Sequence, residues 1–355
     1  MAYGSGYFKT TYEADMALVD TRLRRLALAA LIALLAVLPR LASPFVLELV
    51  TQTALAAVGA LALNMLTGLA GQISLGHAGF LCAGAFTVGI LTESVKAPPL
   101  VALPAAAMVG ALLGILVGVP SLRLKGLYLA LGTLAMHFVV LYVASEYQAR
   151  WGFNTGVSVP APVIAGIRVR TGVQWYYVLV AFAMLTTFLS VNLGRSRVGR
   201  AWMAIHDREI AAASLGIAVA RYKLLAFVAS SVLTALAGAL WAYYRSFVSV
   251  EAFSFVVTIE FIAMIVIGGM GSTLGALLGA GFVTLLPYGI DAVVGALAPG
   301  GAAPYWLFPL KFGAFGLLMA LFLVFEPLGL VGIWRRARTW VVLWPLRYAP
   351  LRTVR

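Results

Sequence analysis

The sequence predicts an all-α polytopic membrane protein with about ten transmembrane helices, roughly eight to eleven, and with both termini in the cytoplasm. Three observations lead to this fold class. First, 63% of the 355 residues are hydrophobic, only 10% are charged, and the mean hydropathy is +1.00. Second, apolar runs follow one another at lengths that suit a bilayer. Third, Lys and Arg gather between these runs, as in cytoplasmic segments, because basic residues are hard to translocate.

The apolar runs divide the chain into spans, loops and tails. The expected spans lie near residues 26–38, 46–66, 100–119, 127–144, 224–243, 253–271, 274–297 and 306–325, with another that ends near residue 193. Residues 1–25 form a cytoplasmic N-terminal tail, residues 26–330 the transmembrane domain and residues 331–355 a basic cytoplasmic tail. Pro39 is expected to end the first span. No cleavable signal peptide is expected, because the first apolar run begins only near Leu26.

Composition and charge exclude several classes of function. The formal net charge of +13 comes from 25 basic and 12 acidic residues, but the basic residues cluster at span ends, so topology explains them better than nucleic-acid binding does. No Walker A sequence is present, so the chain is not expected to hydrolyse ATP. Cys82 is the one cysteine and is expected to be inert packing. No metal cluster and no nucleophile paired with a base is evident, so neither a metal site nor an enzyme is expected.

The longest polar interruption is residues 193–223, which we expect to be a cytoplasmic loop. Its middle predicts a short helix, because Trp202, Ile205, Glu209 and Ala212 lie near one stripe. Gly216 supplies a helix stop. Two interpretations fit these charges: a helix that a motor subunit grips, or a solvated loop that only sets the topology.

Two glycine-rich stretches interrupt the apolar spans. Residues 64–85 combine glycines with polar side chains, and residues 265–276 form a second such stretch. Glycines allow helices to pack closely, and they also allow a helix to break where it lines a cavity. Both interpretations remain open from the residues alone. The Ala-Gly-Ala sequence at 237–239 likewise suits close helix contact.

A few ionisable side chains fall inside the predicted spans. Glu260 stands in apolar sequence, where a charge costs roughly 2.5 to 3.5 kcal/mol on insertion scales, so it should face protein or water. It faces a solute path, pairs with a basic neighbour, or is hydrogen-bonded near the outer face. His137 is a candidate proton relay, although a hydrogen bond to a neighbouring carbonyl is the commoner role, and Asp291 is a further ionisable residue in a span.

Ordered motifs in these segments resemble one family. Gly71-Gln72-x-Ser74-Leu75-Gly76, the loop sequence from Gly199-Arg200-Ala201 to Leu215-Gly216-Ile217, and Ile265-Val266-Ile267-Gly268-Gly269-Met270-Gly271 resemble the permeases of branched-chain amino acid ABC importers, M-type subunit. The likeness covers residues 56–332. Residues 326–330 resemble the family's closing motif, although Glu326 stands where a basic residue is usual.

The resemblance implies roles for particular residues. Those implied to couple to an ATP-binding subunit are Gly199, Arg200, Ala204, Asp207, Glu209, Ala211, Ala212 and Gly216. The candidates for the translocation path or its helix breaks are Asn64, Gly71, Gln72, Ser74, Gly76, His77, Glu260, Gly268, Gly269 and Gly271, and the resemblance supplies those within residues 71–76 and 268–271. The outer loop, residues 146–174, is either a docking surface for a solute-binding protein or an ordinary Gly/Pro loop.

The resemblance also implies an inner-membrane permease that works with two ATP-binding subunits, a second related permease and an external solute-binding protein, without nucleic acid. ATP would be bound by the partner subunits, and no cofactor is expected in this chain. The implied solutes are branched-chain amino acids, or urea, amides and other amino acids. The residues alone also fit a different class of protein. This alternative is a self-sufficient secondary transporter or channel that uses His137, Glu260 or Asp291 as ion sites.

Overall fold

The computed structural model describes residues 22–124, 126–151, 155–164, 166–297, 307–326 and 328–342. The chain divides into two units, residues 1–48 and 49–355, each described here by itself. The first contains α2 (Arg22–Leu41), which starts before the expected span and continues through Pro39. The expectation that Pro39 ends this helix was therefore wrong. A proline in the last turn removes only one backbone hydrogen bond, so the helix closes two residues later. The rest of both tails, residues 1–21 and 343–355, lies outside the described residues.

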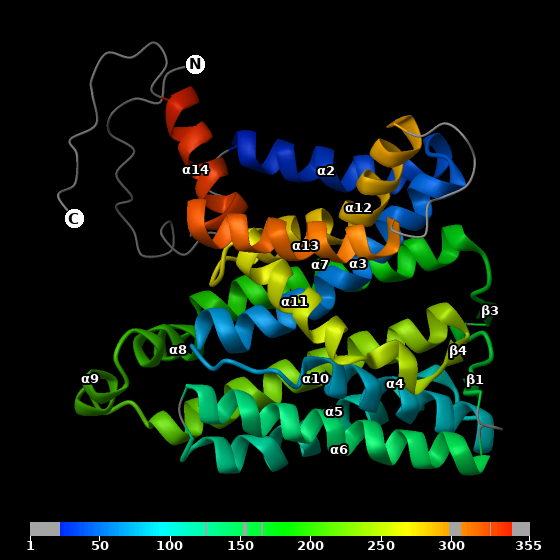
Figure 1. Ribbon diagram of the computed structural model, residues 1–355, viewed down its shortest axis with the longest axis horizontal. Helices are drawn as coiled ribbons and strands as arrows, with labels where there is room; N and C mark the ends of the chain where they lie inside the picture. The colour runs from blue at the N-terminus through cyan, green and yellow to red at the C-terminus, as the bar shows by residue number, and fades with distance from the viewer. Residues whose placement is uncertain are drawn as a thin grey trace. The chain divides into compact units, whose positions relative to one another are not determined.

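The second unit is a bundle of helices. In chain order its elements are the rest of α3 (Pro44–Leu63) with η1 (Asn64–Leu69), α4 (His77–Ser94), α5 (Pro99–Ser121), α6 (Leu127–Trp151), α7 (Gly172–Arg195), α8 (Arg197–Asp207), α9 (Glu209–Ser214), α10 (Val219–Arg245), η2 (Val250–Phe253), α11 (Phe255–Gly268), α12 (Thr273–Leu297), α13 (Leu307–Phe325) and α14 (Gly329–Val342). Figure 1 shows the long helices running side by side, with α8 and α9 at one end, called the loop end below.

The opposite end carries short strands and is called the strand end. There β1 (Val157–Ser158) pairs antiparallel with β4 (Phe247–Val248), and β2 (Val163–Ile164) pairs with β3 (Ile167–Arg168). The segment expected as an outer loop from residue 146 begins later, because α6 continues to Trp151. Residues 152–154 of that loop lie outside the described residues. The two ends of the bundle thus separate the segments expected outside from those expected inside.

The all-α polytopic architecture is confirmed in its coarse form. Among the described residues, seven helices are long and apolar enough to cross a membrane. They are Pro44–Leu69, Pro99–Ser121, Leu127–Trp151, Gly172–Arg195, Val219–Arg245, Val250–Gly268 and Thr273–Ala292. The count of about ten and the cytoplasmic location of the termini stay predictions.

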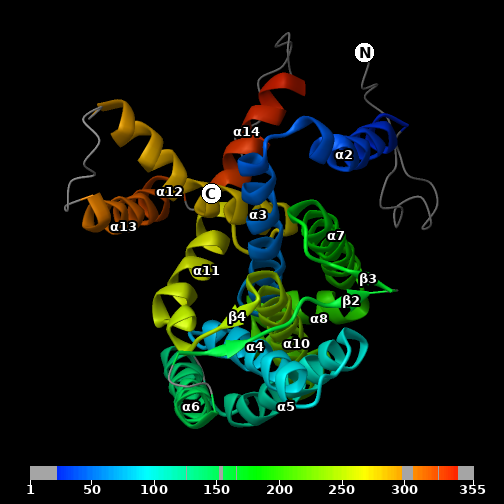
Figure 2. The same ribbon diagram turned by 90° about the vertical axis from the view of Figure 1, so that its right-hand side faces the viewer.

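Helices α4 and α10 form the centre of the bundle. Seen along the helices, α4 and α10 lie together, with α5 and α6 on one side and α11 on another (Figure 2). A Cβ at Gly84 of α4 would overlap the carbonyl oxygen of Ala235, and one at Gly238 of α10 would overlap that of Leu81. The glycines therefore permit backbone contact between the two helices, in agreement with the close contact expected at residues 237–239.

We expect Gly84→Val to lower the thermal unfolding midpoint of the purified protein. The added side chain has no space against the backbone of Ala235, and overpacking of this kind costs roughly 1–3 kcal/mol. Gly289→Val is the matched control, because the space around Gly289 is open. Equal midpoints for the two variants in detergent would show that α4 and α10 are not in backbone contact.

Candidate functional site

The loop at residues 193–223 folds into two short helices. Helix α8 starts after Ser196, whose Oγ accepts from the N–H of Gly199 over 3.2 Å, and α9 follows it after a single extended residue, Arg208. Gly216 has φ +82°, a left-handed conformation that favours glycine, so the expected helix stop is where the sequence predicted it. The single helix expected here is instead split at Arg208.

One face of this helix pair is fixed to the bundle. Trp202 is fully buried, and its Nε1–H donates to the carbonyl of Tyr222 at 2.8 Å. Ile205 and Ala212 are also buried, as the predicted stripe requires. The fourth member of the stripe, Glu209, forms an ion pair of 3.0 Å with Lys223, a buried residue near the start of α10. The helix pair is therefore attached to α10 at two points.

Away from this face, the helix pair exposes two large apolar side chains. Ile210 and Leu215 are each 81% exposed, although both are large aliphatic residues. Asp207, Ala211 and Gly216 are exposed beside them. Large aliphatic side chains on a surface mark an interaction site when they cluster. The sequence motif drew attention to the charged and small residues and missed Ile210 and Leu215.

The first glycine-rich stretch contains a true helix break. After the wide turn η1, residues 70–76 are not helical, and α4 begins only at His77. Hydroxyl groups from two distant helices satisfy the freed backbone: Thr133 Oγ1 accepts from the N–H of Leu75 at 2.8 Å, and Thr258 Oγ1 accepts from the N–H of Ala78 at 3.0 Å. Irregular backbone at membrane depth is tolerated only when protein satisfies it in this way.

The second break, residues 269–272, meets the first. The N–H of Gly271 donates to Oδ1 of the fully buried Asn64 over 2.9 Å. A Cβ at Gly68 would overlap both the Asn64 side chain and the backbone of Gly271. The two glycine-rich stretches, far apart in sequence, thus form one junction between the halves of the bundle. We call the contact of Asn64 and Gly68 with Gly271 the break junction.

The break junction is close to the helix pair α8–α9. A Cβ at Gly71 would lie 2.6 Å from Cδ2 of His206, near the end of α8. Trp202 belongs to the same hydrophobic cluster as Leu66 and Leu69, which precede the break. Gln72, which follows it, donates from Nε2 to the carbonyl of Lys223 over 3.5 Å. The candidate coupling residues and the first helix break are therefore one packed unit at the loop end.

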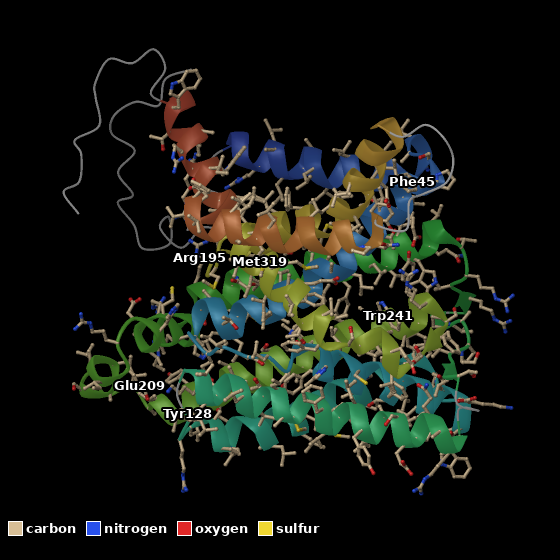
Figure 3. All side chains as sticks on the ribbon, in the orientation of Figure 1. Phe45, Tyr128, Arg195, Glu209, Trp241 and Met319 are labelled. Carbon is tan, nitrogen blue, oxygen red and sulfur yellow. The ribbon has the colours of Figure 1, made fainter. Side chains whose placement is uncertain are left out.

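A cavity of about 370 Å³ lies toward the other end of the bundle. Helices α3, α4, α10, α11 and α12 line it, and Trp241 and Arg245 near the strand end are among its walls. Figure 3 shows Trp241 well away from Glu209 along the helices. The Tyr288 hydroxyl donates to Gln52 Oε1 at 3.2 Å within the lining. The cavity has the volume typical of a small-molecule site.

Glu260 is the acidic residue of the cavity lining. It is partly buried, and within the described part of the chain it forms no ion pair. Most of the wall around it is apolar, including Phe261, Met264 and Val283. A carboxylate in such a wall is suited to bind a positively charged group of a solute.

The structure separates the path residues predicted from the sequence into two groups. Glu260 lines the cavity, whereas Gly71, Gln72, Asn64 and Gly271 do not and lie at the loop end. Ser74, Gly76, His77, Gly268 and Gly269 also lie in or beside the breaks rather than in the cavity lining. His77 contacts the ring of the cavity residue Phe261, with ring centroids 4.6 Å apart.

The other ionisable candidates do not reach the cavity. His137 is buried on α6, where a Cβ at Gly79 would lie 2.9 Å from its Cα, and Asp291 is exposed on α12. Gln52, Arg245 and Tyr288 were missed, since each is an unremarkable polar residue in the sequence until the fold brings them together. Thr133 and Thr258 were missed as well, although a hydroxyl inside an apolar span is a usable signal.

Comparison with known proteins places the chain in a family. A family model described as branched-chain amino acid transport system / permease component matches residues 45–324. The chain is 32% identical over 281 residues to the high-affinity branched-chain amino acid transport system permease protein LivM of Salmonella typhimurium, and 33% identical to LivM of Escherichia coli K12. Each alignment covers 72% of this chain and 66% of the relative, so the chain spans just under two thirds of the length of these proteins.

More distant relatives carry a different description. The chain is 30% identical over 221 residues to the autoinducer 2 import system permease protein LsrC of Enterobacter sp. strain 638. This alignment covers 60% of this chain and 61% of that protein. No solved structure matches the chain. The family match and the seven helices able to cross a bilayer identify a multi-pass protein of the inner membrane. The chain belongs to the family of permease components of branched-chain amino acid transport systems.

Proposed function

We propose that this chain is the membrane-spanning permease subunit of an ABC importer, which translocates branched-chain amino acids or a related small polar solute such as urea or an amide. One observation carries the proposal: the α8–α9 pair is packed against the first helix break, through His206 on Gly71 and through the cluster that joins Trp202 to Leu66. A displacement of this pair must therefore move the break.

The cavity is the proposed solute chamber. It lies toward the strand end, whereas the break junction of Asn64, Gly68 and Gly271 lies beneath it at the loop end. In this arrangement the solute enters from the strand end and is held above a closed junction. Opening the junction would require the hydrogen bond between Gly271 and Asn64 to break.

The α8–α9 pair is the proposed contact for an ATP-binding subunit. Its exposed Ile210 and Leu215 offer apolar surface to the partner, while Trp202 and the Glu209–Lys223 ion pair hold the other face to α10. ATP binding and hydrolysis in the partner would push on this pair and switch access to the cavity. The full importer is proposed to contain two ATP-binding subunits, a second related permease and an external solute-binding protein, with ATP bound by the partners and no cofactor in this chain.

A secondary transporter is the alternative proposal, because Glu260 lines the cavity and has no ion-pair partner among the described residues. Such a transporter would use this carboxylate as an ion site and would need no motor. It assigns no role to the exposed apolar tip of α8–α9, so we favour the importer.

The test is uptake by the reconstituted complex in lipid vesicles, offered leucine, isoleucine, valine and urea in turn. We expect uptake that requires ATP and all the partner subunits, with the branched-chain amino acids preferred because most of the cavity wall is apolar. The purified chain alone should move no solute. Uptake by the chain alone, driven by an ion gradient, would contradict the importer and support the secondary transporter.

A further inference from the structure

Helix α14 (Gly329–Val342) has a distinct apolar face and a distinct basic face. At 100° per residue, Ile333, Trp334, Ala337 and Trp340 fall within one sector of about 120°. The arginines of the helix, Arg335, Arg336 and Arg338, fall outside that sector. Residues 333–340 are all exposed, including both tryptophans at 58% and 57%. The helix therefore presents aromatic and basic groups to its surroundings at the same time.

The first turn of α14 is packed against the bundle. Val331 is buried, and a Cβ at Gly329 would lie 2.6 Å from the carbonyl oxygen of Ile267. A Cβ at Gly269 would lie 2.7 Å from the carbonyl oxygen of Leu328. The first turn of α14 is thus anchored on the second helix break, at Gly269. This residue is close in sequence to Gly271 of the break junction.

The direction of α14 differs from that of the spanning helices. Figures 1 and 2 both show it running across the axis of α11 and α13, from the loop end of the bundle. Helix α13 ends at Phe325, only four residues before α14 begins. If α11 and α13 cross the bilayer, α14 lies along the membrane surface, where Trp side chains concentrate and an amphipathic basic helix binds.

Among the described residues, one of the three arginines of α14 forms an ion pair within the chain. Arg336 Nη2 pairs with Glu326 Oε1 at 3.1 Å. Arg335 and Arg338 form no ion pair among the residues that the structure describes. These two guanidinium groups are free to meet an external anion, and guanidinium binds phosphate through parallel hydrogen bonds.

We propose that α14 lies in the headgroup layer of the membrane and binds anionic phospholipid through Arg335 and Arg338, with Trp334 and Trp340 in the interface. A basic residue near an anionic leaflet strengthens association about fivefold, so the two arginines together account for roughly 20- to 30-fold. Because the first turn of α14 is seated on Gly268 and Gly269, the bound leaflet holds the second helix break in place.

The test follows a fluorophore on the full chain in lipid nanodiscs. Cys82→Ala removes the one native thiol, and Ala337→Cys places an environment-sensitive label on the apolar face of α14. The nanodiscs contain phosphatidylcholine with an increasing fraction of phosphatidylglycerol, and quenching by brominated acyl chains reports insertion. We expect quenching to rise with the anionic fraction and to weaken at high salt.

Three variants decide the assignment. Arg335→Gln with Arg338→Gln should lower the association constant of α14 for the anionic surface roughly 20- to 30-fold, whereas Arg335→Lys with Arg338→Lys should retain binding. Arg336→Gln is the matched control and should have a smaller effect, because Glu326 already neutralises that residue. Equal quenching in pure phosphatidylcholine, or no effect of the double Gln variant, would overturn the proposal. Quenching lost when the ATP-binding subunit is added would show that a protein covers α14 instead.

Discussion

The double substitution Glu209→Lys with Gly216→Pro is expected to abolish ATP-dependent uptake while the chain still inserts into the membrane. Lys at position 209 would face the buried Lys223, with which Glu209 forms an ion pair of 3.0 Å, and would replace attraction by repulsion. Breaking a buried pair costs about 3–5 kcal/mol, and the partial exposure of Glu209 places this one toward the lower end. Proline fixes φ near −65°, which is incompatible with the φ of +82° at Gly216, and it removes the N–H that donates to Ala213 at 3.0 Å.

The measurement pairs uptake with ATPase activity in vesicles that contain the whole complex. We expect ATPase activity to lose its dependence on solute, because the helix pair no longer transmits motion to the break. Glu93→Lys is the matched control, since it makes the same charge change at an exposed position at the strand end. Unchanged uptake in the double variant would remove the coupling role from α8 and α9.

The second large effect is expected at Glu260. Glu260→Gln keeps the shape of the side chain and removes its charge from the cavity wall. A hydrogen bond to a charged group contributes about 1.5–3 kcal/mol, so uptake of an amino acid, which carries an ammonium group, should fall roughly 10- to 150-fold. The same change should raise the thermal stability of the protein, because an unpaired carboxylate is costly in an apolar surrounding.

Opposite effects on transport and stability distinguish a solute-binding role from a structural one. Glu260→Asp, which keeps the charge, should retain part of the uptake. Glu93→Gln, at an exposed site near the end of α4, serves as the control for loss of a carboxylate. If Glu260→Gln lowers stability and leaves uptake unchanged, the carboxylate stabilises the fold and does not meet the solute.

Local features of the loop followed from the sequence, whereas its tertiary contacts did not. The stripe of Trp202, Ile205 and Ala212 and the stop at Gly216 depend on helical periodicity and on backbone conformation, which neighbouring residues encode. The split at Arg208 depends on how Glu209 reaches Lys223, and that contact exists only after α10 has packed. The sequence therefore predicted one helix where there are two.

The helix breaks and the cavity show the same limit. Glycine and polar side chains marked both stretches but left close helix packing and helix breaks as alternatives, and the hydrogen bond from Gly271 to Asn64 joins residues 207 positions apart, which no local pattern can predict. Glu260 could be named as a candidate site residue from the sequence, because a charged residue in an apolar run is evident without knowledge of the fold. Gln52 and Tyr288 carry no such mark, since each is an ordinary polar residue until the folded chain brings α3 and α12 together.

The backbone contact between α4 and α10 has a consequence for biogenesis. Val219 follows Ser94 by 125 residues, so a ribosome that adds about 5–20 residues per second finishes α4 roughly 6–25 seconds before α10 emerges. During that interval the glycine-containing surface of α4 has no helix packed against it. Neither lipid tails nor the insertion channel can contact this surface as closely as a helix backbone does. We therefore expect slow translation between the two helices to lower the yield of mature protein.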